Sequence, residues 1–232
     1  MSKNELLKGK NFLSYLTIRW FNTLAIQTIT LTVGWQIYEL TRNPLDLGLI
    51  GLAQFIPIFI FILPSGVVAD KFDRKIVLAI CNIIHLAVCF FLLFYSLSGP
   101  TSIVPILLVL LIHGTARAMY QPSLSAILPN IVEKRLFPNA TAYNSSVSKL
   151  GHLIGPLIAG IIISLFNIWV YLFAIACFSI STIATFFLKN PKNPDNLKAI
   201  SFATVVRGFV YVWKTKLVLG TMTIDLFAVL FG

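Results

Sequence analysis

Acidic residues are scarce in this sequence, and charged residues of either sign are few. Asp and Glu number 8 against 18 Lys and Arg, charged residues make up 11% of the chain, and hydrophobic residues make up 57%. A soluble domain has about 25% charged and about 45–50% apolar residues. The composition therefore excludes a soluble enzyme, a disordered chain and a disulfide-stapled secreted module, and it favours a polytopic membrane protein.

Cysteines and catalytic signatures are equally sparse. The three cysteines, Cys81, Cys89 and Cys177, lie inside apolar segments at spacings that match no metal site. The sequence has no G-x-x-x-x-G-K-[ST], H-E-x-x-H or G-x-S-x-G motif. The net charge of +10 falls in short clusters between apolar runs, which argues against nucleic-acid binding. We therefore expect no enzyme activity, no cofactor, no metal and no nucleic-acid partner.

Long apolar runs are what the sequence does have. A bilayer crossing needs about 20 residues, and six runs meet this length: residues 15–38, 45–65, 76–97, 102–120, 140–165 and 168–188. A further run at 217–232 would rise about 24 Å, short of a crossing. Residues 1–10 are polar and basic with no small-residue cleavage site, so the first run is expected to be a retained helix rather than a signal peptide.

The distribution of Lys and Arg predicts the orientation, because these residues are enriched in cytoplasmic loops. With the N-terminus inside, fourteen of them fall on the cytoplasmic side and only Arg42 falls outside. We expect a six-helix transmembrane bundle at residues 1–188 and a cytoplasmic linker with an interfacial amphipathic helix at 189–215. An incomplete seventh transmembrane helix is expected at 216–232.

The most informative motif lies between the second and third runs, where residues 66–75 read G-V-V-A-D-K-F-D-R-K. Membrane topology explains the basic residues but does not require Gly66 and Asp70, which lie four residues apart at a helix end. We expect Gly66 to be a close packing point between helices. Asp70 is expected to lie within reach of a neighbouring helix end or a basic partner.

This stretch resembles the loop signature G-x-L-A-D-R-x-G-R-K of the major facilitator superfamily. The matching positions are Gly66, Ala69, Asp70, Arg74 and Lys75. Asp73 stands where the superfamily usually has Gly, and D-K-F-D-R-K is similar to the branch that includes the enterobactin exporter and drug efflux permeases. The resemblance implies that Gly66, Asp70, Arg74 and Lys75 form a gating motif, in which Asp70 contacts the other half of a transporter.

The fifth run carries small residues at helical spacing. Gly151, Gly155 and Ala159 fall four residues apart, which makes one helix face flat enough for close packing. Pro156 removes a backbone hydrogen bond and favours a kink. With Gly160, this stretch is similar to the G-P-x-x-G-G element of antiporters in the superfamily. Ordinary helix packing is the alternative to a role in gating, and the two are compatible.

Polar residues inside the runs mark a candidate substrate cavity, because each is costly in lipid. One stripe of the first run holds Arg19, Trp20, Thr23, Gln27, Thr30 and Gly34. Gln27 is the better candidate for a substrate contact, since Arg19 could instead extend to the headgroups. In the fourth run His113 and Arg117 lie four residues apart, and Arg117 loosely corresponds to an exporter arginine of the superfamily. A cation in the cavity suits an anionic or hydrogen-bonding substrate; a charge resting at the inner interface is the alternative.

The three histidines, His85, His113 and His152, fall near the middle of separate runs. Histidine titrates near pH 6.5 and can relay protons, so each is a candidate proton relay, although a buried hydrogen-bonding role is the alternative. No carboxylate lies at mid-membrane in the first six runs. Many proton-coupled exporters of the superfamily use an acid in the first helix, so the coupling residue stays open.

The sequence and its resemblance together predict an all-α integral membrane protein. The resemblance implies a six-helix bundle of two inverted three-helix repeats and the start of a second bundle, with the substrate held between the halves. We expect proton-coupled efflux of a small amphipathic compound, a drug or siderophore, by alternating access at the inner (plasma) membrane. The alternatives are a truncated, non-transporting half or scaffold that acts only as a dimer, and a lysophospholipid-type lipid transporter. Expected partners are the substrate, the bilayer, and a C-terminal half or a second copy.

Overall fold

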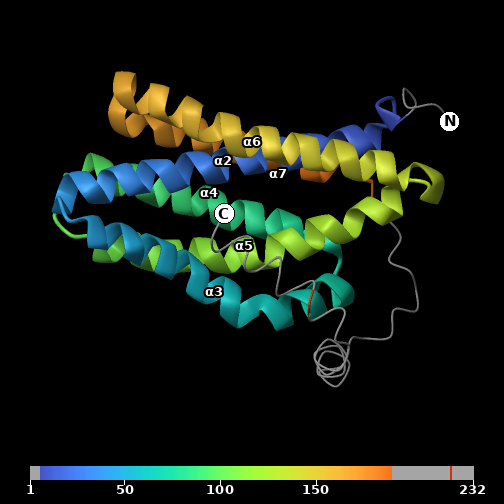
Figure 1. The fold of residues 1–232 in the computed structure, drawn as a ribbon, viewed down its shortest axis with the longest axis horizontal. Helices are drawn as coiled ribbons and strands as arrows, with labels where there is room; N and C mark the ends of the chain where they lie inside the picture. Colours follow the sequence, from blue (N-terminus) through green and yellow to red (C-terminus); the bar gives the residue numbers. More distant parts are fainter. Residues whose placement is uncertain (1–5, 190–219, 221–232) are drawn as a thin grey trace. The chain divides into compact units, whose positions relative to one another are not determined.

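The computed structural model describes residues 6–189 and residue 220, and these residues are almost entirely helical. Within that part of the chain six long helices follow one another, with no strand between them (Figure 1). They are α2 (Lys10–Thr41), α3 (Pro44–Lys71), α4 (Arg74–Leu97), α5 (Val104–Ile131), α6 (Phe137–Phe166) and α7 (Val170–Phe187). Short 3-10 segments, η1 (Lys134–Leu136) and η2 (Asn167–Trp169), precede α6 and α7. The all-α prediction is confirmed, whereas the predicted linker helix and seventh helix lie outside the described residues.

Most of the described chain is apolar enough to cross a membrane. By length and composition four stretches qualify: Pro44–Ile62, Arg74–Leu97, Val104–Ile131 and Lys134–Phe187, the last of which contains both α6 and α7. The helix α2 is as long as the others but is not among them. Its polar residues, including Asn22, Gln27 and four threonines between positions 23 and 32, lower its hydropathy.

Helices α3 and α5 continue at their C-terminal ends well beyond the apolar runs that predicted them. The helix α3 continues past residue 65 to Lys71, through Pro57 and Pro64, and α5 continues past residue 120 to Ile131. Prolines are tolerated in membrane helices because neighbouring groups satisfy the freed backbone carbonyls. Only Phe72 and Asp73 therefore connect α3 to α4. Asp73, which departs from the superfamily signature, caps α4 by accepting a hydrogen bond from the backbone N–H of Lys75 at 2.9 Å.

The helix pairings follow the pattern of two related three-helix units. The units are α2–α4 and α5–α7, and the first helix of each packs against the second and third helices of the other. Thus α2 packs on α6 and α7, α5 packs on α3 and α4, and α4 packs on α7. The three α2–α3, α4–α5 and α6–α7 connections lie at one end of the bundle, on the left in Figure 1. The α3–α4 and α5–α6 connections lie at the other end, near residue 6.

A buried polar layer separates two apolar clusters along the bundle. One cluster includes Leu24, Val88, Leu110 and Phe178, and the other includes Ile18, Cys81, Ala116 and Ala184. On each of the helices α2, α4, α5 and α7, a buried polar residue falls between these clusters in the chain. These residues are Asn22, Asn82, His85, His113 and Ser181.

The layer is joined by hydrogen bonds between helices. Asn22 Nδ2 donates to Asn82 Oδ1 at 3.0 Å, and Asn82 Nδ2 donates to Ser181 Oγ at 3.2 Å. The amide and hydroxyl groups of this layer therefore find inside the bundle the partners that lipid does not provide.

Small residues bring α6 unusually close to α2. A Cβ added at Gly155 would lie 2.7 Å from Gln27 Cβ, and one added at Gly151 would lie 2.9 Å from Thr23 Cγ2. Ala159, on the same face, is fully buried. The helix α6 continues through Pro156 without interruption.

Gly160 and Gly66 do not have the predicted close packing. A Cβ at either position would meet no described atom within 4 Å. Gly160 is turned by about 100° from Ala159, away from α2. Gly66 follows Pro57 by nine residues, about half a turn of rotation away from the face of α3 that contacts α5.

The α2–α6 packing predicts a position-dependent effect of alanine. Gly155→Ala should destabilise the protein by about 1–3 kcal/mol, because the new methyl group overpacks the contact with Gln27. Thermal unfolding of the detergent-solubilised protein, followed by tryptophan fluorescence, measures the effect. Gly160→Ala, which adds the same methyl group to open space on the same helix, is the control. Equal melting temperatures for the two variants would contradict the packing seen here.

Candidate substrate groove

Two adjoining cavities lie along the polar face of α2. One of about 460 Å³ opens between α2, α3 and α5, and one of about 440 Å³ opens between α2, α3 and α6. Both are lined by Thr30, Gly34 and Leu47, so they form one continuous depression, the α2 groove. The other residues that line the α2 groove are Gln27, Leu31, Trp35, Tyr38, Ile50, Gly51, Gln54, Phe55, Ile58, Arg117 and Pro156.

The predicted cavity residues separate into two groups. Gln27, Thr30 and Arg117 line the α2 groove. Thr23 does not, because it is buried under Gly151 of α6. His113 is fully buried and faces the interior of the bundle, so its assignment to the cavity is also wrong.

Arg19 and Arg117 connect four helices through neutral side chains. Arg19 on α2 donates from Nη1 to Gln121 Oε1 on α5 at 2.7 Å and from Nη2 to Ser148 Oγ on α6 at 3.1 Å. Arg117 on α5 donates from Nη1 to Gln54 Oε1 on α3 at 3.3 Å. The guanidinium of Arg19 therefore bonds across the bundle rather than extending to the headgroup region.

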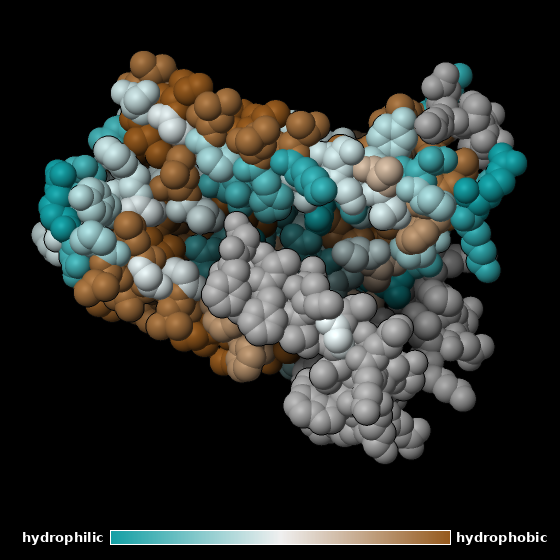
Figure 2. Space-filling view, in the orientation of Figure 1, coloured by the Kyte–Doolittle hydropathy of each residue, from teal (hydrophilic) through white to brown (hydrophobic). Residues whose placement is uncertain are grey.

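No acidic side chain among the described residues pairs with either arginine; the ion pair seen in this part of the chain joins Arg42 to Glu39 at 2.8 Å. The sequence has no Asp or Glu between residues 74 and 132 or between residues 134 and 189. Figure 2 shows a hydrophilic strip between the apolar surfaces of α6 and α3. The guanidinium charges thus lie on a polar face that carries no described counter-charge.

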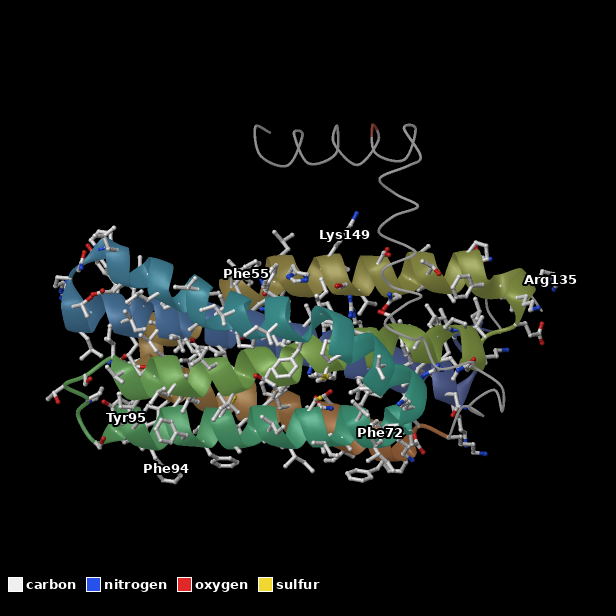
Figure 3. All side chains as sticks on the ribbon, turned by 90° about the horizontal axis from the view of Figure 1, so that it is seen from below. Phe55, Phe72, Phe94, Tyr95, Arg135 and Lys149 are labelled. Atoms are coloured by element: carbon white, nitrogen blue, oxygen red, sulfur yellow. The ribbon has the colours of Figure 1, made fainter. Side chains whose placement is uncertain are left out.

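The basic residues of α6 lie apart from the arginine side chains. Lys149 is exposed and projects outward from α6, away from the other helices (Figure 3). His152, one turn further along the helix, is also exposed. Lys149 therefore does not contribute to the α2 groove.

Two of the three histidines form a buried pair. His85 Nδ1 and His113 Nδ1 are 3.0 Å apart, the ring centroids are 4.5 Å apart, and both side chains are fully buried. One Nδ1 must carry a hydrogen and the other must accept it, so the two neutral rings are opposite tautomers. Neither Nε2 atom has a hydrogen-bond partner among the described residues. His152 lies outside this pair, so the three histidines do not form one continuous relay.

The basic residues of the motif at residues 66–75 tie helix ends together. Arg74 is buried and donates from Nε to the carbonyl of Ala69 on α3 and from Nη1 to the carbonyl of Ala126 on α5, each at 3.0 Å. Lys75 Nζ donates to the carbonyl of Phe186 on α7 at 2.8 Å. The side chain of Asp70 is not among those that the structure describes, so its gating role stays a prediction.

The sequence reading missed several amide residues. Gln54 holds Arg117, and Asn22 and Asn82 form the centre of the polar layer, yet none was a candidate site residue. The available signal was an isolated amide inside an apolar run, since each such group must find a partner within the bundle.

Comparison with known proteins identifies the family. Residues 13–229 match the model of a family described as transmembrane secretion effector. The chain belongs to this secretion effector family. The match confirms the resemblance to the major facilitator superfamily seen at residues 66–75, and with the apolar helices it shows a multi-pass membrane protein.

Several curated relatives support this placement. The chain is 26% identical over 140 residues to the staphyloferrin A transporter of Staphylococcus aureus, covering 58% of this chain and 34% of that protein. It is 22% identical over 141 residues to macrolide efflux protein A of Streptococcus pyogenes, covering 61% and 34%. It is 24% identical over 214 residues to the enterobactin exporter EntS of Escherichia coli, covering 90% and 50%. The alignments thus extend over between a third and a half of the length of these secretion effector relatives.

The bonds of Arg74 predict a local structural role in this family member. Arg74→Gln should lower the melting temperature of the purified protein, because two carbonyls at the ends of α3 and α5 lose a charged donor; such hydrogen bonds contribute about 1.5–3 kcal/mol. Lys71→Gln removes the same charge from an exposed side chain three residues earlier and serves as the control. A melting temperature for Arg74→Gln equal to that of the control would contradict the bracing role.

Proposed function

We propose that this chain contributes the substrate-binding bundle of a secondary active exporter, which moves a small amphipathic compound, a drug or siderophore, out of the cell. The observation that carries the proposal is the presence of the α2 groove in a chain that belongs to the secretion effector family. Its walls combine apolar side chains such as Leu47 and Phe55 with polar groups such as Gln27 and Arg117. Small-molecule sites commonly have this composition, with a few polar groups that orient the ligand on a mainly apolar surface. The names of the relatives motivate the substrate classes.

The membrane orientation belongs to the proposal. The end of the bundle that holds the start of the chain and the α3–α4 and α5–α6 connections is rich in lysine: Lys8, Lys10, Lys71, Lys75 and Lys134. Arg42 lies at the opposite end. Basic loops stay in the cytoplasm. We therefore place the N-terminus in the cytoplasm and the protein in the inner (plasma) membrane.

Alternating access requires a second bundle to face the α2 groove. We propose that a C-terminal half, or a second copy of the chain, provides it. The intact mass of the polypeptide in its native membrane decides between these partners. A mass near the 25.8 kDa of this sequence favours a pair of copies, and a mass near twice that value favours a second half in the same chain.

Proton antiport completes the proposed mechanism. The mid-membrane parts of the six runs contain no carboxylate, so the titratable groups there that change charge near neutral pH are histidines. We propose that the His85–His113 pair carries the coupling proton. An added proton would bind the unprotonated Nε2 of the ring that donates through Nδ1, which converts the existing N–H···N contact into a charge-assisted hydrogen bond.

Filling the α2 groove should block export. A Cβ at Gly34 would meet no described atom within 4 Å, and Gly34 lines the groove, so Gly34→Trp places a large side chain there from a position where the Cβ has room. In an efflux-deficient strain, cells that express the intact wild-type protein should accumulate less macrolide or siderophore than cells that express Gly34→Trp. The difference should be roughly tenfold if the substitution weakens binding by about 1.4 kcal/mol.

The control for this variant is Gly48→Trp, which adds the same side chain at an exposed position of α3 with equally open surroundings. Gly48→Trp should export like the wild-type protein. Normal export by Gly34→Trp, with equal protein levels in the membrane, would show that the α2 groove is not the substrate site.

The histidine pair predicts a separate effect on energy coupling. In proteoliposomes, His113→Gln should remove the acceleration of substrate uptake by an imposed pH gradient and leave downhill exchange of substrate intact. The matched variant His152→Gln, on exposed α6, should keep the pH-gradient response. A normal response in His113→Gln would assign the coupling proton to a different group.

A further inference from the structure

The two arginines near the α2 groove are held by acceptors that do not neutralise them. Arg117 donates to the amide oxygen of Gln54 at 3.3 Å, and Arg19 donates to the amide oxygen of Gln121 at 2.7 Å. An amide oxygen accepts a hydrogen bond and fixes the guanidinium in place, but it carries no net charge. Each guanidinium is therefore oriented while its full positive charge is kept.

The two arginines are connected through neighbouring turns of α5. Gln121 follows Arg117 by one helical turn on the same face of α5, so the head group of Arg19, bonded to Gln121, lies beside the turn that carries Arg117. Two helices, α2 and α5, thus bring a guanidinium to the same region of the polar face.

This arrangement is costly unless an anion enters it. A charged side chain inside a membrane is costly, so such residues normally pair with an opposite charge or with a ligand. No described carboxylate pairs with either arginine, and Arg19 Nε is buried without a hydrogen-bond partner among the described residues. Unneutralised positive charge in a recess with apolar walls concentrates anions there.

We propose that the α2 groove selects substrates that carry an oxyanion, such as a carboxylate. The oxyanion binds the free N–H groups of Arg117 with the charge of Arg19 behind it. The apolar body of the substrate lies along Leu47, Ile50 and Phe55, which line the same cavity as Arg117. Planar guanidinium groups suit this role because they bind carboxylates through two parallel hydrogen bonds. The assignment rests on the proposed function of the α2 groove as the substrate site and adds the charge of the substrate.

Isosteric glutamate variants test the assignment directly. Gln54→Glu and Gln121→Glu keep an oxygen at the position that accepts the arginine hydrogen bond, but they add the missing negative charge. The control is Asn130→Asp, which adds the same charge to an exposed site nine residues beyond Gln121 on the same helix. The probes are 1-naphthoate and its uncharged amide, 1-naphthamide, titrated calorimetrically into the intact protein in nanodiscs.

The wild-type protein should bind naphthoate at least tenfold more tightly than naphthamide. Both glutamate variants should lose this preference because naphthoate binds more weakly, and Asn130→Asp should retain it. A melting temperature equal to that of the wild-type protein shows that a glutamate variant is folded. Absence of naphthoate binding at millimolar concentration, equal wild-type affinities for the two probes, or a preference that survives both glutamate variants would overturn the proposal.

An efflux assay separates this proposal from the proposed function. If the protein binds naphthoate with the expected preference but cells export none of the test compounds, the anion site stands and the export function fails. If cells export neutral and cationic compounds as well as anionic ones, and Gln54→Glu changes none of these rates, the export function stands and the anion selectivity fails.

Discussion

The hydrocarbon interior offers no water, so each polar group placed there must find its partner within the protein. The bundle satisfies this constraint with a layer of side chains that bond from helix to helix between two apolar clusters. Asn82 bonds to Asn22 and Ser181, and His85 bonds to His113. Because these partners come from four helices, the same bonds that satisfy the polar groups also fix how the helices are rotated. The layer is therefore both a polar necessity and a source of structural specificity.

The α2 groove uses the same chemistry differently. In the buried layer, neutral groups bond to neutral groups on other helices. Beside the groove, arginines bond to glutamines, so the hydrogen bonds are satisfied while the charge is not. Side chains that are already held in place but keep an unneutralised charge are preorganised for a charged ligand, since binding requires little reorganisation of the protein. The contrast between the two polar regions explains why one is structural and the other is a candidate site.

The sequence was most informative where a single helix carries the signal. Hydropathy predicted the six helices, residues 66–75 identified the superfamily, and the spacing of Gly151 and Gly155 predicted the flat face that meets α2. Periodicity also placed Gln27 and Thr30 on the face that lines the groove. Such features depend only on the angular positions of residues around a single helix axis, and the spacing of residues in the sequence determines these positions.

Features that depend on two helices at once could not be predicted. The bond between Asn22 and Asn82 joins residues 60 positions apart, and it requires the relative height and rotation of α2 and α4. Gly66 is small enough to be a packing point but faces away from α5, and α3 continues beyond both of its prolines. The glutamines that accept hydrogen bonds from the arginines could not be predicted for the same reason, because each glutamine lies on a different helix from its arginine.

The close approach at glycines has a mechanical consequence. Gly151 and Gly155 bring α6 onto α2, and Gly114 brings α5 onto α3, where an added Cβ would lie 2.8 Å from the carbonyl oxygen of Gln54. Interdigitation at such short range makes each pair stiff against sliding. The walls of the α2 groove come from both pairs, and the bond from Arg19 to Gln121 links the pair α2–α6 to the pair α3–α5. The bond from Arg19 to Gln121 therefore joins two closely packed helix pairs, and both pairs supply walls of the groove.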